Sequence, residues 1–406
     1  MLISIIKRFR RFSKHLRGLI WKPVTKSEVL QFGGREITAL RILESEFGIQ
    51  CMPLMGESIN AWILLESFLR GRLGRLGYYS IFIQRTKAKV VIVWHDTNLE
   101  AYCLSREVNV PVVCIQNGVR VDNGSPTGTG FLTTLRKQGE VLRPKVDAYF
   151  VLSESEKARM SQFVDGEFFA HGSLRANHFA SITMSQVQSP NGKRVGFIVS
   201  FPNSHDVPSM RIADNHRPFI SIGGHTLSYV QYFAYDALVA RALFALCAAK
   251  GLEFTIIGKR SASDTLEADF FSHTVSPLVK VLGHVKGDGY SVASNFDYLV
   301  TIDSTLGFEM LGLGKPVAFL PNRIRFCGVD APLTQLSFLD DMPSDGACWS
   351  SATTEEAVGR FLEQWLTQQP SSESLEVKAF TSQVISLDRG NSKLRAYLRD
   401  CVTATS

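Results

Sequence analysis

The most constraining feature of the sequence is an apolar strand that runs into a hydroxyl-rich turn and then a short helix. Residues 296–303 form an apolar, β-branched run that ends in polar residues, which predicts a buried strand. Ser304 and Thr305 are good helix N-cap residues, and Gly307 would let the backbone come close to a ligand. The free amides and the dipole of such a helix N-terminus attract a phosphate group.

Two acidic residues extend this pattern. Asp303 ends the strand, and Glu309 lies one turn into the helix, where its carboxylate could accept hydrogen bonds from ribose hydroxyls. Phosphate at the turn and ribose at the glutamate would together describe a nucleotide-sugar site. The plain alternative is an ordinary capped helix, because strand–turn–helix units with Ser or Thr caps are common in α/β proteins.

The rest of the chain alternates short apolar runs with helical segments, which predicts parallel sheets. With 406 residues, of which 45% are hydrophobic and 20% charged, the chain is long enough for two globular domains. We therefore expect an α/β protein with two Rossmann-like domains and a cleft between them. The expected strands are residues 88–94, 111–115, 148–152, 195–200, 253–257, 279–284, 296–303 and 316–320.

The polar segment 180–194, with one proline and one glycine, is the expected linker between the domains. This divides the chain into a first domain, residues 25–190, and a second domain, residues 191–406, which the last helix near 392–402 should complete. A possible first strand or helix lies at residues 36–43.

Polar side chains follow three expected strands of the first domain, where ligands gather in parallel sheets. Each could simply cap a helix or form a turn, but three polar strand ends on one sheet edge indicate a pocket. These residues are Asp96 and Asn98 after the first strand, Gln116, Asn117 and Arg120 after the second, and Glu154 after the third.

Ser304, Thr305, Gly307 and Glu309, followed by Gly-Lys-Pro at 314–316, resemble the donor-site segment of two-domain (GT-B) glycosyltransferases. With the segments IQNGVR at 115–120 and GSLRAN at 172–177, the chain also resembles a family of surface-carbohydrate (O-antigen) biosynthesis proteins. The matching segments run from about residue 88 to 320. The resemblance implies a nucleotide-sugar donor in the second domain and an acceptor side in the first, with Asn98, Gln116, Asn117, Arg120 and Arg175 in the cleft.

Several residues could supply the chemistry of transfer. Asp236 lies on an aromatic helical face without an obvious helical partner, a setting that raises the pKa of a carboxyl group, although it could be an ordinary first-turn acid. Glu154 could face the cleft from the other side, and Asp96 is a further catalytic candidate at a strand end. Asp303 is expected to orient the turn rather than to attack. No DxD metal motif follows a strand, so Lys259, Arg260, Lys315 or the helix N-terminus should neutralise the leaving phosphate without a metal. A histidine acid/base is also open, with His205, His216, His225 and His284 as candidates.

The characterised enzymes that this pattern resembles transfer β-linked Kdo (3-deoxy-manno-octulosonic acid) from CMP-Kdo to O-antigen or capsule glycolipids with retention. The resemblance therefore implies a CMP-Kdo donor without a further cofactor, a lipid-linked glycan acceptor and a carboxylate nucleophile, which we place at Asp236 as a hypothesis. Three alternatives remain open: a transferase that uses another nucleotide sugar, a nucleotide-sugar 2-epimerase of the same architecture, and a scaffold without enzymatic activity.

The net charge of +6 is concentrated at the N-terminus, where no acid precedes Glu28. Apolar residues there recur at helical spacing, so residues 1–24 are expected to form a basic amphipathic helix that lies on an anionic membrane surface through residues 1–22. The alternative is a helix packed on the protein itself. The remaining basic residues are mixed with acids, which disfavours nucleic-acid binding. Seven scattered cysteines indicate a reduced, cytoplasmic protein. The basic N-terminal helix would make it peripheral to the inner membrane.

Overall fold

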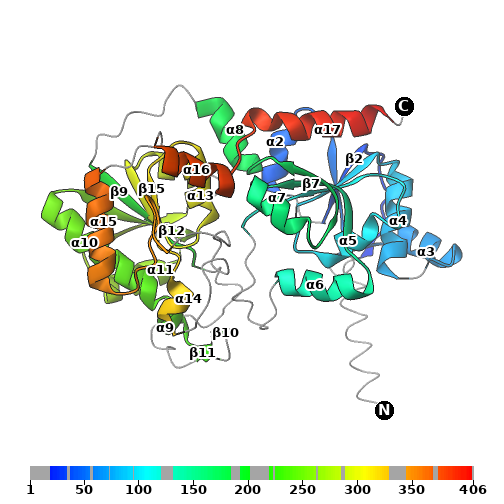
Figure 1. Ribbon diagram of the computed structural model, residues 1–406. Helices are drawn as coiled ribbons and strands as arrows, with labels where there is room; N and C mark the ends of the chain where they lie inside the picture. Colours follow the sequence, from blue (N-terminus) through cyan, green and yellow to red (C-terminus); the bar gives the residue numbers. More distant parts are fainter. Residues whose placement is uncertain are drawn as a thin grey trace, which may run out of the picture.

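The chain folds into two α/β halves that lie side by side (Figure 1). The computed structural model describes residues 19–33, 37–54, 58–72, 74–94, 96–119, 131–183, 193–201, 219–222, 225–261, 264–284, 289–328, 344–368 and 374–404. We call residues 19–183 the first half and residues 193–384 the second half. Each half contains one parallel sheet with its own hydrophobic core, so the predicted pair of Rossmann-like domains is confirmed.

The first half is built on a six-stranded sheet in the order β3-β2-β5-β6-β7-β8, and every strand pair in it is parallel. Its central strands are continuous Val/Ile-rich runs because both faces of the sheet are buried. The strands are β2 (Val29–Phe32), β3 (Ile49–Met52), β5 (Val90–Val93), β6 (Val112–Ile115), β7 (Lys145–Val151) and β8 (Asp165–Ala170).

Helices connect these strands. They are the short η1 (Thr38–Leu40) and α2 (Arg41–Glu44), then α3 (Ala61–Leu69), α4 (Arg75–Thr86), α5 (Leu99–Leu104), α6 (Phe131–Val141), α7 (Glu154–Met160) and α8 (Leu174–Thr183). The segment expected as a first strand or helix at 36–43 is therefore helical where it is described, from residue 37.

The second half contains a five-stranded parallel sheet in the order β13-β12-β9-β14-β15. This order reverses between β9 and β14, and in such sheets ligands bind outside the carboxyl ends of the strands at the reversal. The strands are β9 (Arg194–Ile198), β12 (Glu253–Ser261), β13 (Lys280–His284), β14 (Tyr298–Thr301) and β15 (Val317–Phe319).

The helices of the second half are α9 (Tyr229–Tyr232), α10 (Ala234–Lys250), α11 (Leu266–Thr274), α12 (Gly289–Ser294), α13 (Thr305–Gly312), α14 (Arg323–Phe326), α15 (Glu355–Gln368) and α16 (Leu375–Val384). A hairpin of β10 (Ile220–Ile222) and β11 (His225–Leu227) precedes α9.

The last helix, α17 (Ser392–Thr403), returns to the first half and lies along it (Figure 1). Leu394 and Leu398 are fully buried in the core cluster that contains Val29 and Val90. Arg395 Nη1 also contacts Glu46 Oε2 at 2.6 Å. The expectation that this helix completes the second domain is therefore wrong, because its apolar face is buried by the first sheet.

The N-terminal prediction is corrected in part. Leu19–Ile20 form strand β1, which pairs in parallel with β4 (Ile59–Asn60), so the predicted helix does not extend to residue 24. Residues 1–18, which carry most of that prediction, lie outside the described residues. None of the described helices has the length and apolar composition that a membrane span needs.

Candidate functional site

The predicted turn after β14 has the expected local structure. Ser304 is the N-cap of α13 with extended backbone angles (φ −74°, ψ 127°), and its hydroxyl makes no capping hydrogen bond. Thr301 Oγ1 donates to the Ile198 carbonyl at 3.0 Å and accepts from the Ser304 amide at 3.2 Å. The turn is thereby fixed to β9, at the strand reversal where an α/β sheet binds ligands.

Gly307 has a different role from the one we expected. A Cβ atom at this position would lie 2.5 Å from Thr301 Cγ2 and 3.4 Å from Phe319 Cε1. The missing side chain therefore lets α13 pack closely on β14 and β15, rather than letting the backbone approach a ligand.

Glu309 lies where the two halves meet. Its carboxylate is buried and hydrogen-bonded by the hydroxyls of Ser173, from the first half, and Tyr290, on α12. Burial raises the pKa of Glu309 to about 7, against the lowering effect of the two hydroxyls and the nearby Arg175 charge. The Tyr290 ring stacks on Phe179 of α8 with 5.5 Å between ring centroids. Glu309 therefore lies at the junction of the two halves, and its carboxyl group has a pKa near neutral pH.

A second contact joins the turn to the first half. The Val119 amide, which follows β6, donates to Thr305 Oγ1 at 3.5 Å. The carboxyl ends of β6 and β14 therefore meet at this junction. The predicted cleft itself stays a prediction, because three segments that follow β6, β9 and α14 lie outside the described residues: 120–130, 202–218 and 329–343.

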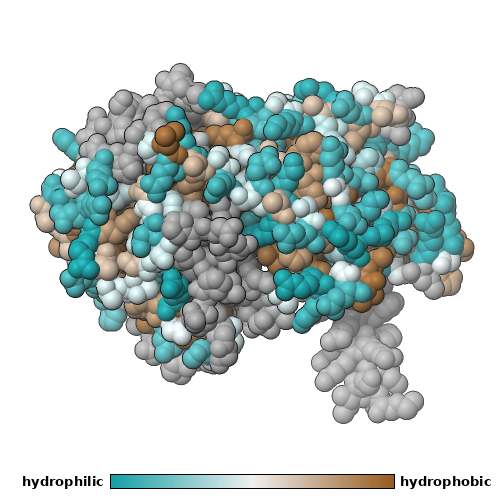
Figure 2. Space-filling model, in the orientation of Figure 1, coloured by the Kyte–Doolittle hydropathy of each residue, from teal (hydrophilic) through white to brown (hydrophobic). Residues whose placement is uncertain are grey.

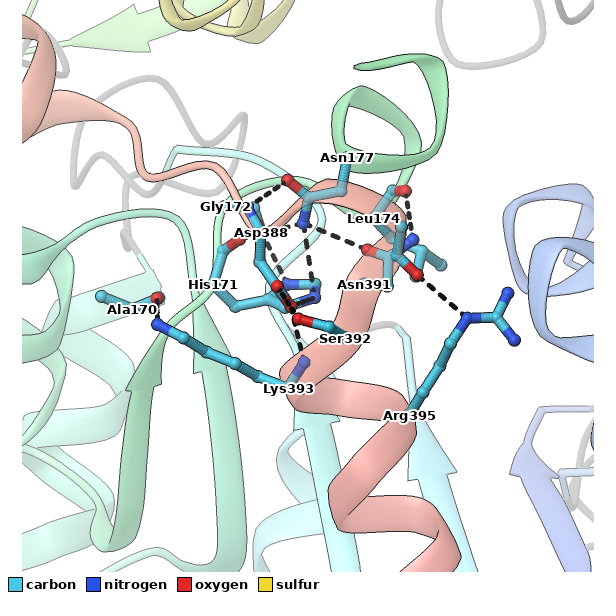
Figure 3. A network of polar contacts seen from close by, with 11 residues as sticks. Ala170, His171, Gly172, Leu174, Asn177, Asp388, Asn391, Ser392, Lys393 and Arg395 are labelled. Atoms are coloured by element: carbon cyan, nitrogen blue, oxygen red, sulfur yellow. Dashed lines mark hydrogen bonds and ion pairs between the residues drawn. The ribbon is translucent and has the colours of Figure 1, made fainter. Parts of the chain in front are cut away.

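The segment GSLRAN at 172–177 contacts residues 386–391, which we call the crossing chain because they lead from the second half to α17 (Figure 3). Gly172 has φ +85° and pairs with Leu387, and a Cβ there would lie 2.0 Å from the Ser386 carbonyl oxygen. Asn177 Oδ1 accepts from the Asp388 amide at 2.9 Å. Only glycine fits this backbone approach, so the segment is a structural clamp at the junction.

Polar side chains complete this clamp (Figure 3). Asn177 Nδ2 donates to Asn391 Oδ1 at 3.1 Å, and Asn391 Nδ2 donates to the Leu174 carbonyl at 3.1 Å. Burial lowers the pKa of His171 to about 4, although Asp388 Oδ2 lies 3.6 Å from its Nε2 and opposes this. His171 is therefore neutral at physiological pH.

Asp236 has a partner that the sequence did not reveal. Its oxygens Oδ2 and Oδ1 accept from Arg323 Nε and Nη2, both at 2.8 Å, while Arg323 Nη1 contacts Asp303 Oδ2 at 2.5 Å. Burial opposes the charge of the guanidinium, but the two carboxylates outweigh it and raise the pKa of Arg323 well above its usual range. Burial also raises the pKa of Asp236, as we expected.

This geometry does not suit Asp236 as a nucleophile. The carboxylate is completely buried, and both of its oxygens are bonded to one guanidinium. It could reach a sugar carbon only by leaving a buried ion pair, which is costly. Asp303 differs, because its Oδ1, although buried, has no hydrogen-bond partner among the described residues. Asp236 therefore positions Asp303 through Arg323.

The predicted phosphate-binding cations occupy three different settings. Lys259 is exposed near the carboxyl end of β12. Arg260 is buried and paired with Asp264. Lys315 donates to the carbonyls of Ser294 and Phe296, which lie before the start of β14 and so away from the turn. Lys315 is thus excluded as a phosphate ligand, and burial lowers its pKa.

Three of the seven predicted first-half residues support the local structure. Asp96 is buried and accepts from the Tyr149 hydroxyl at 2.9 Å, and Asn98 caps α5 by accepting from the Glu100 amide at 3.0 Å. Gln116 is also buried, and it donates to Glu156 Oε2 and accepts from the Leu152 amide.

The other candidates are more accessible or fall outside the described residues. Asn117 and Arg175 are exposed, and Arg175 acts electrostatically on Glu309. Glu154 is exposed at the start of α7, where it lines a groove of about 860 Å³ beside α17. Arg120, His205 and His216 lie outside the described residues, as does the side chain of His284, while His225 is exposed in β11.

Sequence reasoning missed Ser173, Tyr290 and Arg323. Ser173 lies in the GSLRAN segment, but nothing in that segment indicates contact with residue 309. Tyr290 and Arg323 lie in helices too short for a clear periodic signal. Within the described residues, no cluster of three His, Cys, Asp or Glu side chains could hold a metal ion.

This architecture, two Rossmann-like halves that meet at their strand ends with a C-terminal helix returning to the first, defines the GT-B class of fold. Known structures agree. The wall teichoic acid polymerase TagF, as the H548A variant, is 12% identical with a TM-score of 0.52, covering 95% of this chain and 90% of that one. A TagF H444N structure soaked with CDPG is 11% identical with a TM-score of 0.51, covering 98% of both chains.

A "putative UDP-N-acetylglucosamine 2-epimerase" from Listeria monocytogenes has a TM-score of 0.52 at 9% identity, covering 94% of this chain and 98% of that one. No curated protein matches the sequence. Residues 113–402 match the family model described as "putative O-antigen biosynthesis protein". The chain therefore belongs to this family of O-antigen biosynthesis proteins.

Proposed function

We propose that this protein is a glycosyltransferase of surface-polysaccharide assembly that takes its sugar from a nucleotide donor bound at residues 303–309. The observation that carries the proposal is the position of Glu309. Its carboxylate lies at the strand reversal and accepts hydrogen bonds from two hydroxyl groups. Vicinal ribose hydroxyls offer the same donors as Ser173 and Tyr290. The phosphate would bind at the N-terminus of α13, where the Ser304 hydroxyl makes no capping hydrogen bond.

Donor entry then requires the two halves to separate. Ser173 contacts the carboxylate from the first half, so a ribose can replace it only if this half moves away from α13. The clamp at residues 172–177 and 386–391 holds the crossing chain and would act as the hinge. Closure around a donor would bring an acceptor on the first half to the sugar and exclude water.

The chemistry we propose is metal-independent transfer with retention, in which a carboxylate displaces the nucleotide and the acceptor hydroxyl then displaces the carboxylate. Asp303 is the preferred carboxylate because its Oδ1 has no hydrogen-bond donor among the described residues while Arg323 fixes Oδ2, and separation of the two halves would have to expose this buried oxygen. The exposed Lys259 and the α13 N-terminus would stabilise the leaving phosphate. Asp303→Asn should then abolish transfer while nucleotide binding persists.

The donor we favour is CMP-Kdo, with a lipid-linked glycan as acceptor and an inner-membrane surface contacted through residues 1–22. A thermal-shift panel of CMP, CDP, UDP and GDP tests the class of donor. A nucleotide at a hundred times its dissociation constant adds about 2.7 kcal/mol to the free energy of unfolding. Stabilisation by CMP alone supports a CMP-linked sugar, whereas stabilisation by none of the four contradicts a transferase.

An epimerase is the second candidate, supported by the fold shared with the Listeria protein. An epimerase converts its sugar nucleotide without an acceptor, whereas a transferase consumes the donor only when acceptor is present. An assay of the donor with and without glycolipid acceptor therefore distinguishes the two activities.

A further inference from the structure

The first half carries a concentrated apolar surface that the proposed reaction does not use. Among the 13 exposed large hydrophobic side chains of the described residues, five lie on α3, and a sixth, Trp21, follows strand β1 beside it. We call this surface the α3 face. It consists of Trp21, Trp62, Leu64, Leu65, Phe68 and Leu69.

The sequence of α3 explains why this surface stays exposed. Ile63 and Ser67 are buried on the side of the helix that packs against α4, and Asn60 caps the helix through its side chain. Trp62, Leu65 and Leu69 recur at helical spacing on another side. Helix α3 is therefore apolar on more than one face, although only one of them meets the protein's core.

The α3 face continues onto the N-terminal strand. Trp62 Nε1 donates to the Trp21 carbonyl at 2.9 Å, and the two indole rings meet edge to face with centroids 6.3 Å apart. Between the helix and the strand lies a groove of about 550 Å³, lined by Leu19, Trp21, Leu64, Leu65 and Phe68 among others. Indole rings of this kind favour membrane interfaces, where one side is apolar and the other wet.

The border of this surface is basic. Lys22 and Arg72 are exposed around it, and so are Arg70 and Arg75, which pair with the adjacent acids Glu66 and Glu100. Arg85 also pairs with Glu66, so basic residues outnumber acids along this border. Residues 1–18, which join the surface at Leu19, contain six Lys or Arg and no acid. A second copy of the chain, or residues 1–18 themselves, would bring like charges together on this surface, whereas an anionic lipid bilayer complements it.

We propose that the α3 face inserts its apolar side chains into the interface of an anionic bilayer. This inference extends the membrane contact of the proposed function, which was assigned to residues 1–22, and rests on it. Helix α3 lies at the end of the first half that is remote from the second (Figure 1), and hydrophobic side chains are visible at this end in Figure 2. The first half would rest on the membrane beside its lipid-linked acceptor, leaving the donor half free to move.

The test is co-sedimentation of the full chain with phosphatidylcholine vesicles, with and without phosphatidylglycerol. The variant Phe68→Ser/Leu69→Ser changes side chains that are 66% and 74% exposed, and the matched control Leu278→Ser/Leu375→Ser changes side chains that are 84% and 87% exposed. Partitioning onto phosphatidylglycerol vesicles should fall at least about tenfold for the α3 variant, because two apolar side chains no longer insert. The control should partition like the wild type, and equal partitioning of both double variants would overturn the proposal.

Hydrogen exchange and size-exclusion chromatography separate the other occupants. Slower exchange of the α3 amides when vesicles are added supports bilayer docking, because the helix's own hydrogen bonds set the protection of the free protein. Exchange that vesicles leave unchanged would contradict it. A wild-type dimer that the α3 variant abolishes would assign the face to a second copy and overturn the proposal. The nucleotide thermal-shift panel uses no vesicles, so a negative result in the vesicle experiments does not affect the test of the donor site.

Discussion

Ser173 and Glu309, 136 positions apart in the chain, share a hydrogen bond that joins the first half to the helix after β14. The serine belongs to the segment that clamps the crossing chain, and the glutamate belongs to the helix that follows the turn. This contact would couple the domain closure that we propose to the group that we propose as the ribose ligand.

Replacing Ser173 by alanine should raise the pKa of Glu309 above about 7, because the serine hydroxyl favours the ionised carboxylate. We also expect a loss of about 1–2 kcal/mol in the free energy of unfolding from the unpaired buried oxygen. Denaturant unfolding and carboxyl NMR titration measure the two effects. Ser181→Ala is the control, since its exposed hydroxyl bonds only to the His178 carbonyl in its own helix. An unchanged carboxyl titration would contradict the contact.

Glu309 should make stability depend on pH in a defined direction. Its folded pKa of about 7 exceeds the ordinary value of 4.5, so the folded state binds more protons between these values. Relative to Glu309→Gln, the wild type should therefore lose up to about 3 kcal/mol as the pH rises from 4.5 to 7, and no more above it. Unfolding of both proteins across this range measures the difference, and His171 titrates alike in each. A pH-independent difference would mean that the carboxylate is not buried as described.

Arg323, Asp236 and Asp303 form an ion triad, and we expect its members to contribute unequally to the free energy of unfolding. Arg323→Met leaves Asp236 and Asp303 without their common cation and should cost about 3–5 kcal/mol of unfolding free energy. Asp236→Asn should cost less, because Arg323 keeps Asp303. Arg360→Met removes an exposed pair with Glu356 and should change stability little. Equal losses for Arg323→Met and Arg360→Met in chemical denaturation would contradict the burial of the triad.

Gly307 offers a packing test. Alanine there would crowd Thr301 Cγ2 and should destabilise the protein by about 1–3 kcal/mol. Thr301→Ser removes that methyl group and should recover part of the loss in the double variant, while its hydroxyl keeps both hydrogen bonds. Gly359 in α15 has open space around its Cβ position, so Gly359→Ala should stabilise by up to about 1 kcal/mol. If Gly307→Ala destabilises the protein and Thr301→Ser recovers none of the loss, contact with the Thr301 methyl group is not the cause.

Much of the fold could be predicted from the sequence because buried parallel strands are continuous apolar runs, as in β5 and β6. Strands β2 and β3 were not predicted, since a glutamine interrupts each short apolar run, and β8 begins with Asp-Gly-Glu. The place of α17 could not be predicted either. Its buried leucines reveal an apolar face but not which of two cores receives it.

The candidate site was predictable only as far as local structure determines it. The cap at Ser304 and the helix that contains Glu309 follow from neighbouring residues. The partners of Glu309 do not, because Ser173 and Tyr290 arrive through the docking of two halves. The same holds for Asp236, whose ion pair comes from α14, 87 positions further along the chain. The apolar surroundings of Asp236 were predicted from the sequence, but its ion pair with Arg323 was not.

The most direct test of the account is calorimetric titration of the panel's best nucleotide into wild-type protein, Glu309→Gln and Glu156→Gln. Both glutamates are 7% exposed, but Glu156 lies in α7 and contacts Gln116 rather than the turn. We predict that the wild type and Glu156→Gln bind alike, whereas Glu309→Gln binds at least about tenfold more weakly, through loss of charge-assisted bonds to ribose. Equal affinity for all three proteins would contradict a nucleotide site at residues 303–309.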